Sequence, residues 1–274
     1  MSKENTELKS KIIDWLQKQG YPLEMSVARK FRTLGFNTIQ SDYYKDIDTE
    51  VSREIDVTAY IQNEIDGVLI RTEFFVECKS AIDKPWIILT SSDIQLADRA
   101  RIVQRAASKL GQAFLESVSE REDILKLPIF LIPNRAGYGL IQAFSDHVDI
   151  PYGAIMGAIK AAVAEVKEMD KFPAISRRIC LVSFPVVIID GLLYECYLNK
   201  DGEVIIKEAE IGTLLWRNPI VGMPHSIVNI VPMGYLDTFL KGAVKTARML
   251  TEDCSRELNS ARSEFGKEKA KGMY

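Results

Sequence analysis

Two strand-like segments joined by a tight turn constrain the fold of this chain more than any other part of its sequence. Residues 53–62 alternate between apolar and more polar side chains, and residues 68–79 form a second, more apolar segment. Between them, Asp66-Gly67 is a typical hairpin turn. A hairpin makes its two strands antiparallel neighbours, so the chain is expected to build a β-sheet around this pair.

The remaining sequence alternates helical and strand-like periodicity. We expect further strands at 36–44 and 127–133, a hairpin of residues 180–190 and 192–198 around Asp190-Gly191, a hairpin turn at Asp201-Gly202, and helices at 5–19, 23–34, 92–118, 152–169 and 234–268. Pro185 indicates that its strand starts late, lies at an edge or contains a bulge. This alternation predicts an α/β or α+β class, with a central mixed sheet flanked by helices.

The length and composition suit one soluble domain. At 274 residues the chain can bury a large core, and no clear linker divides it, so residues 1–274 are treated as a single domain with a frayed polar tail at 255–274. No apolar run approaches the roughly 20 residues of a membrane span, and the N-terminus lacks the apolar stretch of a signal peptide. We therefore expect a cytoplasmic protein with no membrane contact.

Charge and metal-ligand spacing exclude several functions. The net charge of −3 gives no global attraction to nucleic acid, so any such contact needs a local basic patch. The four cysteines include no CxxC pair, which argues against a zinc site. His147 and His225 have no nucleophile motif nearby, and no phosphate-binding GxxxxGK[ST] loop is present.

The segment "FFVECKS", residues 74–80, carries two charges where a buried strand is expected. Glu77 and Lys79 are two residues apart, so both side chains leave the same face of the strand. Asp56 lies in the preceding strand, and the hairpin can bring it close to Glu77; Glu54 shares its face. One alternative stays open, in which Glu77 and Lys79 belong to a solvated strand edge.

A fourth charge lies on a predicted helix. Glu24 falls within about 60° of Val27, Ala28 and Phe31 around the helix axis, in the stripe that should face the sheet. A buried carboxylate without a partner is costly, and a cation would relieve that cost. The alternative is a first-turn residue favoured by the helix dipole.

Converging carboxylates without histidine or cysteine side chains form a hard oxygen site. Such a site suits Mg²⁺ or Mn²⁺ far better than Zn²⁺. A lysine beside it, here Lys79, can orient an attacking water, help to deprotonate it, or stabilise the charge of a phosphoryl transition state.

These residues carry a family resemblance. "PLE" in a helix, "REID" in a strand and "FFVECKS" in the next strand resemble the PD-(D/E)xK nuclease superfamily, the restriction-endonuclease-like fold. The resemblance covers about residues 20–90 and implies a core of order αβββαβ, completed by later strands and helices. Ile55 stands where the name-giving motif has proline, as in many members.

The resemblance implies a role for each residue. Asp56 would be the central metal ligand, Glu77 the second, and the backbone carbonyl of Cys78 a further one. Glu24 would match the acid that many members carry on the first core helix, and Lys79 would be the catalytic lysine. The implied activity is Mg²⁺-dependent hydrolysis of phosphodiesters, DNA being the expected substrate, with a restriction or defence system as one setting.

Two further interpretations accompany this one. The chain can instead be a catalytically inactive nuclease-fold module that binds nucleic acid or a protein partner; the acidic balance favours that alternative. Alternatively, the chain supplies the nuclease activity of a multi-protein defence system whose partner proteins deliver DNA; a homodimer is a further alternative assembly. The only local basic patch we identify is a helix face formed by Arg101, Arg105 and Lys109, which can contact phosphate or simply face solvent.

Overall fold

The computed structural model describes residues 3–145, 149–171, 178–217 and 226–271. Its helices are α1 (Lys3–Lys18), α2 (Tyr21–Thr33), α3 (Ala100–Val103), α4 (Lys109–Val118), α5 (Glu122–Leu125), α6 (Ile150–Asp170), α8 (Leu236–Glu252) and α9 (Ser255–Lys271), with 3₁₀ turns at Pro128–Phe130 and Met233–Tyr235. Its strands are β1 (Asn37–Lys45), β2 (Ser52–Ile65), β3 (Val68–Lys79), β4 (Trp86–Ser91), β5 (Ala106–Ala107), β6 (Ala136–Gln142), β7 (Ile179–Ile189), β8 (Leu193–Leu198), β9 (Val204–Glu208), β10 (Gly212–Trp216) and β11 (Ser226–Pro232).

Within the described ranges, eleven strands form one mixed sheet of order β1-β2-β3-β7-β11-β10-β6-β4-β8-β9, with β5 pairing on β7. The predicted hairpin is confirmed: β2 and β3 are antiparallel around Asp66-Gly67, both of which have positive φ. β7 then adds to β3 in parallel, and β11 adds to β7 in parallel. The expected α/β class, a mixed sheet with flanking helices, is therefore correct.

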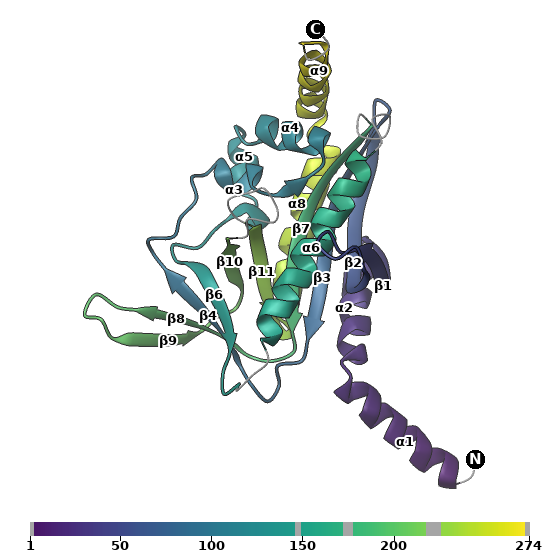
Figure 1. Ribbon diagram of the computed structural model, residues 1–274, viewed down its shortest axis with the longest axis vertical. Coiled ribbons are helices and arrows are strands. Elements are labelled where there is room, and N and C mark those ends of the chain that lie inside the picture. Colours follow the sequence, from purple (N-terminus) through teal and green to yellow (C-terminus); the bar gives the residue numbers. More distant parts are fainter. Residues whose placement is uncertain (1–2, 146–148, 172–177, 218–225, 272–274) are drawn as a thin grey trace.

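Helices cover both faces of the sheet. α6 crosses one face over β3 and β7, whereas α2 and α8 pack on the opposite face (Figure 1). Phe74 of β3 stacks on Phe184 of β7 at 5.1 Å between ring centroids and meets the edge of Phe239 of α8 at 6.4 Å. Even-numbered residues of β3 such as Phe74 thus face α2 and α8, and odd-numbered ones face α6.

The helix predicted at 92–118 is wrong in its first half. Only α3 and α4 are helical there, and Ala106 and Ala107 between them form β5, which pairs antiparallel with β7 at Ser183 and Val182. The alanine-rich sequence favours a helix locally, but β7 offers backbone partners that outweigh this propensity. Ser108 then caps α4 by accepting a hydrogen bond from the Gly111 N–H.

Two strand predictions also fail. Residues 127–133 contain the 3₁₀ turn Pro128–Phe130 instead of a strand, because proline starts a helical turn well and cannot donate to a sheet. The segments 180–190 and 192–198 are strands, but β7 pairs with β3 and β11 while β8 pairs with β4 and β9. They are not a hairpin, whereas the turn at Asp201-Gly202 does join β8 to β9.

Pro185 lies inside the sheet and not at its edge. On one side β7 pairs with β3 along its whole length, with Pro185 opposite Phe75. On the other side β5 pairs as far as Ser183 and β11 begins at Val186. Proline thus occupies the break between two partner strands, where a missing N–H is tolerated.

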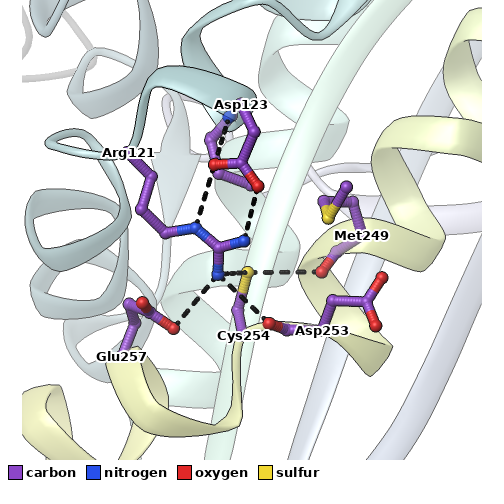
Figure 2. Close-up of polar contacts among 7 residues, drawn as sticks. Arg121, Asp123, Met249, Asp253, Cys254 and Glu257 are labelled. Atoms are coloured by element: carbon purple, nitrogen blue, oxygen red, sulfur yellow. Dashed lines mark hydrogen bonds and ion pairs between the residues drawn. The ribbon is translucent and has the colours of Figure 1, made fainter.

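The single long helix expected at 234–268 is two helices, α8 and α9. The frayed tail expected at 255–274 is wrong for the first turns of α9, which pack on the core. Leu258 and Ala261 of α9 are fully buried. Arg121, which precedes α5, holds the junction of α8 and α9: its guanidinium donates to the Asp253 carbonyl at 3.1 Å and to Glu257 at 3.3 Å (Figure 2). Arg121 also binds Asp123.

The N-terminal helix lies apart from this core. α1 projects from the body of the molecule and joins it through α2 (Figure 1). Its predicted apolar side exists, but Leu8, Ile12 and Trp15 are exposed. No helix in the described ranges is both long enough and apolar enough to cross a bilayer.

Candidate active site

The candidate site forms where β2 separates from β3. The last paired residues are Val57 and Val76. Residues two apart in a strand normally share a face, yet Ile55 packs with Phe75 on the α6 side while Val57 joins the core beneath α2 and α8. The regular alternation of faces therefore breaks at Asp56, where the strand twists.

The Asp56 carboxylate reaches the backbone of β3. Its Oδ2 accepts a hydrogen bond of 2.6 Å from the Cys78 N–H. The N–H and C=O of one strand residue leave on the same edge, so the Cys78 carbonyl also points toward the Asp56 side. The Lys79 carbonyl leaves on the opposite edge, where it accepts from the Asp190 N–H at 3.4 Å.

Glu77 lies on the α6 face of the sheet and is only 7% exposed. Burial is the main cause that raises the pKa of its carboxyl to about 7; the Lys79 cation opposes this rise, and the Asp56 carboxylate adds to it. Burial thus opposes the charged form of this carboxyl, and the Lys79 cation beside it favours that form.

The Lys79 ammonium lies between the two acids. Its Nζ donates to Glu77 Oε2 at 2.6 Å and to Asp56 Oδ2 at 3.4 Å. Burial lowers the pKa of Lys79, but the charges of Glu77 and Asp56 outweigh that effect and raise the pKa above its ordinary value. The three predicted residues are therefore brought together, and a single positive charge lies against two carboxylates from neighbouring strands.

Glu24 approaches this group without joining it. It lies in the first turn of α2 and is half-buried. Burial and then the negative charge of Asp56 raise its pKa, while Lys79 lowers it. Within the described residues, no hydrogen bond or ion pair links Glu24 to Asp56, Glu77 or Lys79. Glu24 is therefore an electrostatic neighbour of the cluster, on the side of the sheet opposite α6.

The basic patch predicted from the sequence does not exist as expected. Arg105 is only 2% exposed, and its guanidinium donates to the carbonyls of Arg101 and Ile129. Arg101 pairs with Asp98, and Lys109 is exposed. The break between α3 and α4 turns Arg105 into the core, so these three residues do not share one solvent-facing surface. His147 and His225 lie outside the described residues.

Sequence reasoning missed the residues around Glu77. An added Cβ on Gly157 of α6 would lie 2.4 Å from Glu77 Oε1, so the helix passes directly over this carboxylate. Tyr44 of β1 is near enough that, after burial, the charge of Glu77 raises its pKa, which reaches about 12. The available signal was a glycine inside a helical pattern, which costs about 1 kcal/mol relative to alanine and therefore indicates a packing reason.

The oxygen donors of this site suit the modest requirements of Mg²⁺. In the described part of the chain, no group of three or more His, Cys, Asp or Glu side chains is arranged to hold a metal ion. Mg²⁺ needs only one or two protein carboxylates, however, because it keeps several waters. Asp56 and Glu77 already converge on one cationic group, the Lys79 ammonium. These two carboxylates fit Mg²⁺ chemically, with the Cys78 carbonyl nearby; Glu24 does not complete the set.

Comparisons with known proteins give no further guide to this site. No protein-family model, no curated protein and no solved structure matches the chain.

Proposed function

We propose that the chain is a Mg²⁺-dependent nuclease that hydrolyses phosphodiester bonds in DNA. The observation that carries this proposal is the convergence of Asp56 and Glu77, from two adjacent strands, on the single cationic group of Lys79. A partly buried lysine and acid often form an ion pair that only stabilises the fold, but such a pair needs one acid and not two. The second carboxylate is what a divalent ion would require.

The order of elements supports the restriction-endonuclease-like part of the proposal. α2, β1, β2, β3, α6 and β7 follow the order αβββαβ, with residues 80–149 inserted between β3 and α6. β7 returns parallel to β3 after the helix. The candidate residues lie on the first helix and on the second and third strands of this series, as the resemblance implies.

Each residue has a role in this proposal. Asp56 and Glu77 would hold Mg²⁺, together with the Cys78 carbonyl, and Glu24 would add negative charge nearby. When bound, Mg²⁺ would supply Lewis-acid polarisation of the phosphodiester and a lower pKa for water. Because both acids raise its pKa, Lys79 is a cation at neutral pH. It suits the stabilisation of charge that develops on the phosphoryl oxygens better than the removal of a proton. By resemblance, the expected products carry 5′-phosphate and 3′-hydroxyl ends.

One observation favours a second candidate, the catalytically inactive module. The Lys79 ammonium already pairs with both carboxylates, so each acid has a cationic partner without any divalent ion. Such a chain would keep the fold as a binding surface for nucleic acid or for a protein partner. Calorimetry with Mg²⁺ or Mn²⁺ separates the two candidates: binding by the wild type that is lost in Asp56→Asn supports the nuclease, and no binding by the wild type supports the inactive module.

The nuclease proposal is tested by cleavage of plasmid DNA with Mg²⁺ and with a chelator. Asp56→Asn and Lys79→Met are expected to lose at least about a hundredfold in cleavage rate, because each removes charge at the reacting centre. Glu54→Gln is the matched control: it changes an exposed acid of the same strand, two residues away. Cleavage by Asp56→Asn at the wild-type rate would place the chemistry elsewhere.

A further inference from the structure

α6 packs against β3 with Gly157 directly over the Glu77 carboxylate. An added Cβ on Gly157 would lie 2.4 Å from Oε1, 2.9 Å from Cδ and 3.3 Å from Cγ of Glu77. Side-chain carbons do not approach a carboxylate that closely, so one of the two partners would have to move. Gly157 is thus the point at which the helix makes space for Glu77.

We propose that Gly157 is a positioning residue for the candidate site: the missing side chain lets α6 lie on the Glu77 carboxylate and holds it against Lys79. This inference rests on the proposed function. Glu77 has little freedom to avoid a larger residue, since it is 7% exposed and faces α6 from the middle layer of the molecule. Displacing Oε1 also displaces Oε2, which lies 2.6 Å from the Lys79 ammonium.

The same helix provides a matched control. Gly153 lies one turn before Gly157, and an added Cβ there would meet nothing within 4 Å. Both substitutions to alanine favour the helix, with the smaller gain at Gly153 in its first turn. A loss in Gly157→Ala that is absent from Gly153→Ala therefore reports the contact with Glu77 and not the loss of a glycine.

The first experiment measures Mn²⁺ affinity by calorimetry. Gly157→Ala is expected to weaken binding by about tenfold or more, the usual effect of disturbing a residue that orients a metal ligand, and Gly153→Ala is expected to bind as the wild type does. Glu77→Asp shortens the side chain by one methylene and relieves the clash. In that background Gly157→Ala is expected to change the affinity by less than about twofold. An equal loss in both backgrounds, or no loss in either, would overturn the proposal.

The second experiment does not depend on metal or on activity, so it separates this inference from the proposed function. Thermal unfolding midpoints are compared for Gly157→Ala in the wild type and in Glu77→Ala. The alanine is expected to lower the midpoint when Glu77 is present and to raise it, as Gly153→Ala does, when Glu77 is removed. If the wild type binds no Mn²⁺, the nuclease proposal is refuted, but the unfolding midpoints still show whether Gly157 makes room for Glu77. The same midpoint shift in both backgrounds would refute the role of Gly157.

Discussion

The Lys79 ammonium donates to Glu77 Oε2 at 2.6 Å while Glu77 is almost fully enclosed between β3 and α6. The same contact therefore affects both the proposed catalysis, through Lys79, and the free energy of unfolding, through the buried Glu77. The lysine side chain is 31% exposed and the glutamate side chain 9%, so loss of the lysine mainly leaves a buried carboxylate without its cation, whereas loss of the glutamate changes packing in the core. Stability and function at this site are expected to respond differently to changes in the two residues.

Lys79→Met is expected to destabilise the protein by about 1–3 kcal/mol. The change leaves the buried Glu77 carboxylate without its cation, and the effect is smaller than for a fully buried pair because Lys79 is partly exposed. Adding Glu77→Gln should restore most of the loss, since the buried charge is then gone and the remaining Asp56 carboxylate keeps its hydrogen bond from the Cys78 N–H. Urea denaturation of the two single variants and the double variant measures this coupling. Lys79→Met with wild-type stability would show that the ion pair contributes nothing.

Glu73 is expected to make stability depend on pH. Burial is the main cause that raises the pKa of this 3% exposed carboxyl from 4.5 to about 8, and Arg71 only partly opposes it. A raised pKa in an acid gives stability that is complete below about pH 4.5 and is lost as the pH rises through about 8. Glu73→Gln should therefore gain stability over the wild type as the pH rises, by about 1.4 kcal/mol per pH unit at the steepest. The exposed Glu64→Gln is the control, and parallel pH curves for wild type and Glu73→Gln would contradict the account.

Arg105 is expected to be irrelevant to DNA binding. It is buried, lies over the rings of Phe130 and Phe184, and forms no ion pair with any residue that the structure describes. Arg105→Met removes a costly buried charge and keeps an apolar chain against the two rings, which offsets the hydrogen bonds lost to the Arg101 and Ile129 carbonyls, so unfolding free energy should change by no more than about 1 kcal/mol. DNA affinity and its dependence on salt should stay unchanged. A fall of about one in the salt slope would mean that Arg105 does contact a phosphate.

Arg121 is expected to hold α9 in place. Arg121→Ala removes the hydrogen bonds to the Asp253 carbonyl and to Glu257, so the first turns of α9 should open more often. Hydrogen exchange in residues 255–261 should rise in this variant. The control is Lys126→Ala, which removes only an exposed pair with Glu122. Equal exchange in both variants would show that burial of Leu258 and Ala261 is sufficient.

Local patterns predicted the hairpin and the meeting of Asp56, Glu77 and Lys79 well. The period of β2, the Asp66-Gly67 turn and the two-residue spacing of Glu77 and Lys79 are all properties of neighbouring residues, and the structure has each of them. The position of Asp56 beside Glu77 follows from the hairpin alone. What the pattern did not contain is the twist at Asp56, which depends on the different packing of Ile55 and Val57.

Pairing between distant segments was not predictable from local sequence. Asp190-Gly191 has the composition of a hairpin turn, but Asp190 accepts a hydrogen bond from the Ala81 N–H at 2.7 Å, and an added Cβ on Gly191 would lie 2.0 Å from the Ala81 carbonyl oxygen. These residues therefore serve a contact with the segment after β3. Likewise, β5 exists only because β7 lies beside it. Gly157 was likewise not predictable from local sequence, because glycine is needed there to make room for Glu77 on another element.

The measurement that tests the central claim most directly is a crystal structure of the wild type soaked in Mn²⁺. The account predicts an anomalous peak in contact with the carboxylates of Asp56 and Glu77, with the Lys79 ammonium moved away from the point midway between them. Absence of that peak, with Lys79 still bridging both acids at saturating Mn²⁺, would contradict the claim that these residues form a metal site.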